Sequence, residues 1–290
     1  MTFAEKNPRF DLLTGETIPF KTKERYLSSY FKDRITMRKW YKETSRENAQ
    51  QKTIEMIINR CKVKKILWGL SEVELRTSPL PTASLLYLVG IHYDDIIKRA
   101  GLKKRFEYKN FSLTVGADDL NKKTTIIQDT REKLPLKSWS KNIDVEIKKL
   151  NYGDYAPKEN PAKLFVDRKS MGDLIGSLSS GNFDRVCREI QRAKDDGAYL
   201  FFVVEHSFQK ALCFEHSYSG KFAKASPDYI FSQLREIMQN FDNVQFVFVP
   251  SREESCAFIE YLFKLGERAK HYDWQFLINL KKAQKHYLAL

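Results

Sequence analysis

Four carboxylates lie where short apolar runs end or turn, within residues 126–169. They are Asp129, Glu132, Asp154 and Asp167. Strands that end in acids can bring those acids together at one edge of a sheet. Several carboxylates and one lysine, Lys169, without a His or Cys cluster, suit a hard cation such as Mg²⁺. Such a site typically serves metal-assisted attack on a phosphodiester bond.

The sequence around these acids resembles the nuclease motif of the XPF family of structure-specific DNA endonucleases. The matching elements are Asp-x-Arg-Glu at 129–132, Gly-Asp at 153–154 and Asp-Arg-Lys-x3-Asp at 167–173, followed by a similar segment at 174–181. The resemblance covers roughly residues 124–270. The family usually has Glu where this chain has Asp167, and the shorter Asp side chain can shift the position of a bound metal.

The resemblance implies a restriction-endonuclease-like α/β nuclease domain, dependence on Mg²⁺ (or Mn²⁺), and hydrolysis of DNA near branches or single-strand/double-strand junctions. Family members of cellular origin often end in paired helix-hairpin-helix modules, and the glycines that such hairpins need are missing after Asn240. A stand-alone nuclease of this kind suits a phage or another mobile element, with a role in DNA repair or recombination.

The residue types suggest a division of roles within the site. Asp154 and Asp167 are the first-choice metal ligands, and Asp129 and Glu132 complete or orient the shell. Lys169 lies two residues beyond Asp167, so in a strand both side chains point to the same face. Lys169 can therefore position the attacking water or polarise the phosphate.

Three further charged residues belong to the same motif. Arg131 and Arg168 are interpreted as outer residues that support the ligands or bind phosphate. Asp173 opens the next helix, where it either holds Lys169 or Arg168 or serves as an ordinary acid at a helix start.

The elements that must position these residues follow an α/β pattern from residue 124 onward. Continuous apolar runs at 199–204 and 244–249 predict buried strands. Helices are expected at 174–178, 183–193, 229–241, 252–270 and 273–290. The predicted fold class is α/β, with a mixed sheet flanked by helices and a smaller all-α N-terminal domain. We expect a basic helical domain at 1–109, a linker at 110–123 with a short strand at 111–115, and a nuclease domain at 124–290.

A helix-turn-helix pattern lies in the N-terminal domain. An apolar segment from 83 to 89 is followed by Gly90 and by a second short helix at 94–100, which Gly101 can cap. A small residue is usual where this chain has Leu86, and a plain helical hairpin is the alternative. The DNA-binding candidates on and after the second helix are Tyr93, Lys98, Arg99, Lys103, Lys104 and Arg105.

The charge of the chain points to a polyanionic partner. The formal net charge is +13, and residues 1–109 hold 23 Lys and Arg against 13 Asp and Glu. A basic excess of this kind is typical of nucleic-acid binding, although a solvated basic surface gives the same numbers. Aromatic residues at 13% argue against disorder.

Other classes of protein are disfavoured. The four cysteines are far apart and predict reduced thiols rather than a zinc site or disulfides. No apolar run approaches the roughly 20 residues needed to span a membrane. The N-terminus lacks the apolar stretch of a secretory signal, so a cytoplasmic location in a prokaryotic or phage-infected cell is expected.

Two other functions stay open at this stage, together with one mode of assembly. The helix-turn-helix could select a sequence, as in a homing or restriction endonuclease, or the fold could be a non-catalytic DNA-binding scaffold. A homodimer through the nuclease domain is also expected. Its basis is that family nuclease domains commonly pair, and that the helices at 229–241 and 252–270 are strongly apolar on one side.

Overall fold

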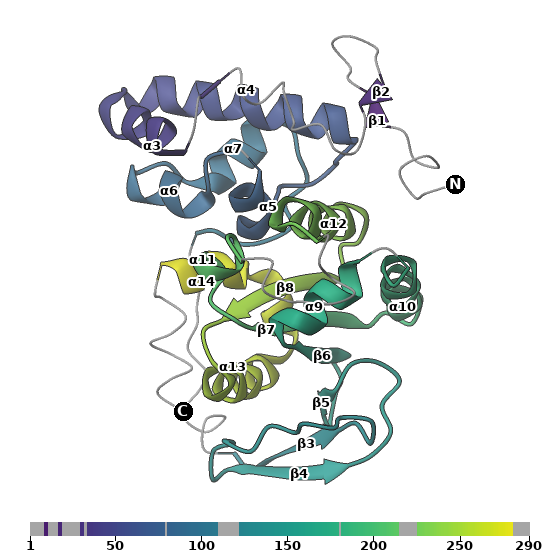
Figure 1. Cartoon of the computed structure of the whole chain (residues 1–290). Helices are drawn as coiled ribbons and strands as arrows, with labels where there is room; N and C mark the ends of the chain where they lie inside the picture. Colours follow the sequence, from purple (N-terminus) through teal and green to yellow (C-terminus); the bar gives the residue numbers. More distant parts are fainter. Residues whose placement is uncertain are drawn as a thin grey trace. The chain divides into compact units, whose positions relative to one another are not determined.

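The computed structural model of the chain describes residues 9–10, 17–18, 30–31, 34–78, 80–109, 122–179, 181–214 and 225–280. Three expectations lie wholly or partly outside these residues: the linker at 110–123, the strand at 111–115 within it and the end of the tail helix at 281–290. The chain divides into two compact units, residues 1–109 and 110–290, and each is described by itself (Figure 1).

The N-terminal unit is mainly helical over its described residues. It contains a two-residue antiparallel strand pair, β1 (Arg9–Phe10) with β2 (Thr17–Ile18), and the helices α3 (Arg34–Glu43), α4 (Arg46–Lys64), α5 (Glu72–Thr77), α6 (Ala83–Leu88) and α7 (Tyr93–Arg99). The longest helix, α4, begins at Ser45, whose side chain accepts a hydrogen bond from the Asn48 amide, and buries Ile54 and Ile57. The apolar periodicity of this region therefore faces a core, as an amphipathic helix requires.

The predicted pair of short helices is present as α6 and α7. Gly90 joins them with φ of +76°, a backbone conformation that favours glycine. Both helices bury apolar side chains, with Leu86 and Ile96 fully inaccessible. The pair has the arrangement that the sequence suggested, while its use as a DNA-binding helix-turn-helix stays a prediction.

The C-terminal unit is built on a six-stranded mixed sheet. Its strand order is β4-β3-β5-β6-β7-β8, from β4 (Ile143–Ile147), β3 (Thr124–Gln128), β5 (Tyr155–Pro157), β6 (Leu164–Lys169), β7 (Tyr199–Glu205) and β8 (Val244–Val249). β5 runs antiparallel to both β3 and β6, and the other neighbours are parallel. β7 and β8 are almost continuously apolar and buried, which is the pattern of parallel strands covered on both faces.

Helices cover both faces of this sheet. They are α9 (Met171–Leu178), α10 (Phe183–Asp195), α11 (Phe208–Ala211), α12 (Pro227–Asn240), α13 (Arg252–Leu265) and α14 (Trp274–Asn279), with the 3₁₀ helix η1 (Gly266–His271) between the last two. Figure 1 shows α9, α10 and α12 on one side of the sheet and α13 on the other. The predicted fold class is therefore confirmed, as a mixed sheet flanked by helices with a helical N-terminal region. None of the described helices is long and apolar enough to cross a membrane.

Two sequence-based expectations need correction here. Asp154 does not end a strand, because β4 stops at Ile147 and Asp154 instead leads directly into β5. The apolar residues of α12 and α13 do not form an open face either, since residues such as Leu234 and Phe258 are buried within the chain. The sequence argument for a dimer through these helices therefore fails, although dimerisation itself is not tested by this burial.

Candidate active site

The three acidic segments of the motif meet at one edge of the C-terminal sheet. β3 ends just before Asp129, β5 begins just after Asp154, and β6 carries Asp167 near its own end. The Asp129 amide donates to the Asp154 carbonyl at 2.8 Å, and the Asp154 amide donates to the Val166 carbonyl at 2.7 Å. Backbone hydrogen bonds thus join the segments directly. The prediction that strand ends gather these acids is correct for the backbone.

Gly153 is required by this close backbone approach. Its φ is +61°, and a Cβ added there would lie 2.5 Å from the carbonyl oxygen of Val166. Any other residue at 153 would combine an unfavourable backbone conformation with a backbone clash. The close backbone approach therefore explains why glycine precedes Asp154 in the Gly-Asp pair of the motif.

Asp154 and Asp167 form the part of the site with excess negative charge. Burial and the nearby charge of Asp167 raise the pKa of Asp154 to about 7, although a hydrogen bond from the Arg168 amide to Oδ2 opposes the shift. No hydrogen bond to Asp154 Oδ1 is found among the residues that the structure describes. Raised carboxylate pKa values of this kind mark places where a cation is favoured.

Lys169 lies on the same face of β6 as Asp167, as their spacing predicts. Its Nζ is 2.8 Å from Asp167 Oδ1 and lies over the ring of Phe202, 5.4 Å from the centroid. Burial tends to lower the pKa of Lys169, but the charge and hydrogen bond of Asp167 outweigh it, so the net pKa is raised. The ion pair with Asp167 therefore favours the charged form of Lys169, which suits a role as a positive charge at the site.

Asp129 is held by the protein itself. Its Oδ1 accepts from the amide and the Nε of Arg131, at 2.8 and 2.7 Å, and its Oδ2 accepts from the Leu150 amide at 2.6 Å. Burial raises the pKa of Asp129, but these hydrogen bonds together leave it below its ordinary value. The carboxylate ties the end of β3 to the loop before Gly153, and its role as a metal ligand stays a prediction.

Glu132 is likewise engaged, by Arg168. Nη2 of Arg168 lies 3.2 Å from both carboxylate oxygens, and the Leu134 amide donates to Oε1 at 2.7 Å. The side chains of both partners are less than one tenth exposed. The predicted outer role of Arg168 fits this geometry. Glu132 is paired with the arginine in this structure, and its role as a metal ligand stays a prediction.

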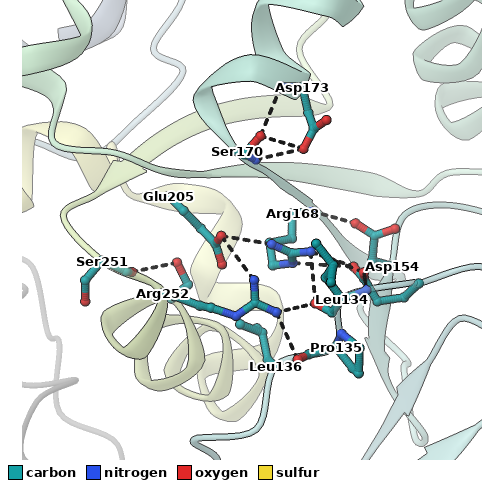
Figure 2. Close-up of polar contacts among 12 residues, drawn as sticks. Leu134, Pro135, Leu136, Asp154, Arg168, Ser170, Asp173, Glu205, Ser251 and Arg252 are labelled. Atoms are coloured by element: carbon teal, nitrogen blue, oxygen red, sulfur yellow. Dashed lines mark hydrogen bonds and ion pairs between the residues drawn. The ribbon is translucent and has the colours of Figure 1, made fainter.

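Two residues outside the predicted set complete this network. Glu205, at the end of β7, accepts from Arg168 Nη1 at 2.8 Å, and Arg252, in the first turn of α13, donates to the carbonyls of Leu134 and Pro135. Figure 2 shows the two arginines side by side, with Glu205 between them. Glu205 carries the same signal as the other acids, an apolar strand that ends in a carboxylate. Arg252 gives no such signal, because its partners lie more than 100 residues away.

Asp173 does not hold Lys169 or Arg168. Its carboxylate accepts from the hydroxyl of Ser170 at 2.6 Å and from the Ser170 amide, while the Ser170 hydroxyl accepts from the Asp173 amide (Figure 2). This reciprocal arrangement is a capping box that starts α9. The ordinary helix-start interpretation is therefore the correct one.

The donors fit a hard cation only in part. Among the described residues, no group of three or more His, Cys, Asp or Glu side chains is arranged to hold a metal ion. Two of the four predicted ligands, Asp129 and Glu132, are taken up by arginines. Asp154 and Asp167 remain, although Asp167 is paired with Lys169. Two carboxylates together with water and substrate phosphate oxygens are a common donor set for Mg²⁺.

The candidate DNA-binding residues of the N-terminal unit divide into two groups. Tyr93 is 1% exposed and the side chain of Arg105 is 5% exposed, so neither presents its side chain at the surface. Lys98, Arg99, Lys103 and Lys104 are exposed. The buried pair was misassigned because the sequence shows basic and aromatic residues on a short helix without showing which side packs inward.

Comparisons with known proteins agree with the motif. Residues 128–262 match the model of the ERCC4 domain family. The solved structure of XPF from Aeropyrum pernix in complex with DNA is 20% identical, covers 49% of this chain and 64% of that chain, and gives a TM-score of 0.38. A second solved structure, of XPF from Aeropyrum pernix, is 19% identical, covers 57% of this chain and 72% of that chain, and gives the same TM-score of 0.38.

This chain thus spans less than two thirds of the length of the first of these XPF chains. No protein among those with curated functions matches it significantly. The family match begins at the end of β3 and contains all three acidic elements of the motif. Residues 128–262 of this chain therefore match the ERCC4 domain family over the segment that carries the acidic motif.

Proposed function

We propose that the protein is a metal-dependent endonuclease that hydrolyses DNA phosphodiester bonds near branches or single-strand/double-strand junctions. The observation that carries the proposal is the pairing of Asp154 and Asp167 beside Lys169, at the sheet edge of an ERCC4 domain. The substrate class follows from the family resemblance.

Asp154 and Asp167 would hold Mg²⁺ or Mn²⁺. When bound, such a cation neutralises charge on the phosphate and makes water a better nucleophile. The raised pKa of Asp154 supports this assignment, because burial and the charge of Asp167 disfavour its ionised form and a bound cation would favour it. Asp129, Arg131 and Glu132 would support the site through the hydrogen bonds described above.

Lys169 would contribute a fixed positive charge to the reaction. Its ammonium is paired with Asp167 and protonated, so it can donate a hydrogen bond to a non-bridging phosphate oxygen. In hydrolysis the water oxygen forms a new bond to phosphorus while one ester bond breaks, leaving one phosphate end and one hydroxyl end. A nearby cation lowers the energy of the extra negative charge on the phosphate oxygens in that step.

A panel of labelled DNAs tests the proposal. Flap, fork, nicked and linear duplexes of random sequence would be incubated with the full chain, in Mg²⁺ and in EDTA. We expect Mg²⁺-dependent cleavage near the junction of flap or fork and little cleavage of the linear duplex. Equal cleavage of all four would remove the junction specificity, and no cleavage with Mg²⁺ or Mn²⁺ would overturn the nuclease assignment.

Assembly as a homodimer stays part of the proposal only through the family resemblance. The apolar helix faces that suggested it are buried within the chain, as described above. Sedimentation of the full chain at micromolar concentration, with and without fork DNA, decides the matter. A monomer under both conditions would exclude a stable dimer.

A further inference from the structure

One side of α10 carries three arginines whose charges the fold does not use. Arg185, Arg188 and Arg192 recur at the spacing that places side chains on one side of a helix, and all three are exposed. Among the described residues, none of the three forms an ion pair. In contrast, Lys194 on the same helix pairs with Asp242 at 2.8 Å. The three guanidinium groups are therefore available to a partner.

Glu189 indicates which way this side of α10 faces. It lies four residues after Arg185 and three before Arg192, so it shares their side of the helix. Burial and the charge of Asp167 raise the pKa of Glu189, while Lys169 and the two arginines oppose the shift. One carboxylate thus interacts with the acids of the site and with the arginine row.

Tyr152 shows geometrically how the C-terminal end of α10 is attached to the segment before Asp154. Its hydroxyl hydrogen-bonds to the carboxylate of Asp196 and lies 3.3 Å from the carbonyl oxygen of Arg192, at the end of α10. Its ring packs edge-on against Phe165 of β6, with centroids 5.5 Å apart. Tyr152 stands two residues before Asp154, so the end of α10 is attached to the segment that supplies a central acid of the site.

The length of the row suits a nucleic-acid backbone. Seven residues of α-helix from Arg185 to Arg192 span about 10 Å. A DNA strand in a duplex carries one phosphate per about 3.4 Å along the helix axis. Three arginines over that distance can therefore contact about three successive phosphates, and the planar guanidinium group is well suited to bind phosphate oxygens in pairs.

We propose that Arg185, Arg188 and Arg192 form a phosphate-binding row that holds the backbone of the cut DNA strand beside Asp154 and Asp167. The inference rests on the proposed function for the identity of the polyanion. It assigns to the nuclease domain a DNA contact of its own, separate from the basic N-terminal unit. The row would act by binding, so it supplies no group to the reacting phosphate.

The test compares three variants of the full chain. The first, R185Q/R188Q/R192Q, removes the row. The second, R185K/R188K/R192K, keeps its charge. The third, K122Q/K123Q/K141Q, removes three exposed charges just before β3 and β4, at the ends of these strands that lie away from Asp129. Thermal unfolding checks that each is folded. Affinity for fork and linear DNA is then measured in EDTA over a range of salt concentrations, so that the binding measurement does not depend on cleavage.

We expect the glutamine variant of the row to weaken binding at least tenfold at low salt. It should also lower the slope of log affinity against log salt by about 2 to 3, since each phosphate contact contributes about 0.7 to 0.9. The lysine variant should keep most of the slope, and the K122Q/K123Q/K141Q control should change it by less than 1. Equal losses in the row and control variants would overturn the inference, as would an unchanged slope for the row variant.

Cleavage assays separate this inference from the proposed function. If the wild-type chain cuts DNA, the glutamine variant should raise KM while kcat stays within a few-fold. If the wild-type chain cuts nothing but the slopes differ as expected, the proposed function fails and the binding row stands. If the wild-type chain cuts and the row variant keeps both its KM and its salt slope, the row fails and the proposed function stands.

Discussion

Arg168 and Glu205 form a buried ion pair, with Nη1 of the guanidinium 2.8 Å from Oε2 of the carboxylate. The other side of the same guanidinium contacts Glu132, and the amide of the same arginine donates to Asp154. Arg168 therefore links a supporting network to one of the two central acids. Loss of one partner from a buried charge pair leaves the other without compensation, which is strongly destabilising.

Replacing Glu205 should disturb the site from a distance. We expect Glu205→Gln to lower the free energy of unfolding by about 3 kcal/mol, because the Arg168 charge loses one of its two carboxylates. If the chain is a nuclease, kcat should fall with little change in KM. Glu253→Gln is the matched control, since Glu253 is exposed in the first turn of α13. Equal unfolding midpoints and kcat for the two variants would refute this role of Glu205.

Asp154 and Asp167 can be tested directly by removing their charges. We expect Asp154→Asn and Asp167→Asn each to reduce cleavage at least a thousandfold while DNA affinity stays within a few-fold, because both acids should bind the metal and not the DNA. Asp144→Asn is the control, as Asp144 is exposed on β4 and pairs only with a surface lysine, Lys123. Near-normal cutting by either site variant would exclude that acid from the reaction.

The raised pKa of Asp154 predicts that its ionised form destabilises the folded protein in the absence of metal. Protonation of this acid in the folded protein persists up to about pH 7, well above its ordinary value of 3.8. The folded state thus binds more protons than the unfolded state between these pH values, so stability falls as pH rises through that window.

We therefore expect Asp154→Asn to raise the unfolding midpoint in EDTA at pH 8, and this gain to shrink toward zero as the pH is lowered to 4. Mg²⁺ at pH 8 should stabilise the wild-type chain but not the variant, because binding to the folded state stabilises it. Thermal scans across pH with and without Mg²⁺ measure both effects. A variant less stable than wild type at pH 8 would contradict the conclusion that ionised Asp154 destabilises the folded protein.

Deletion of residues 1–109 should weaken DNA binding and flatten its salt dependence. This segment holds most of the excess positive charge and corresponds to one compact unit of the fold. The 110–290 fragment should remain folded, with a smaller salt slope in binding titrations. An unchanged slope would show that the N-terminal unit makes few phosphate contacts and would leave binding to the nuclease domain.

Part of the arrangement at the sheet edge could be predicted from the sequence, because it depends on the spacing and type of neighbouring residues. The spacing of Asp167 and Lys169 fixes their common face, and the steric need for Gly153 explains the Gly-Asp pair. The sequence could not show that Asp129 and Glu132 are engaged by arginines. The first depends on how Arg131 folds back onto Asp129, and the second on Arg168, which lies 36 residues from Glu132. A pair so far apart in the chain leaves no periodic signal.

The same limit explains the error in the N-terminal unit. Tyr93 and Arg105 were assigned to a surface from their residue types alone. In the structure Tyr93 stacks edge-on against Tyr108, with ring centroids 5.0 Å apart, and Arg105 lies over the ring of Phe106. Basic and aromatic residues pack against each other in cores as well as against DNA. Residue type alone, without knowledge of burial, therefore cannot distinguish a core position from a DNA-binding one.

Strand β4 has a consequence for handling the protein at high concentration. It lies at the edge of the sheet, and Val145 and Ile147 are 41% and 67% exposed. Exposed apolar edge strands template aggregation, and charged neighbours are a common protection against it. Here Asp144 and Glu146 alternate with the apolar residues and pair with Lys123 and Lys158. Acidic buffers that protonate these carboxylates would weaken that protection and favour strand-to-strand association between molecules.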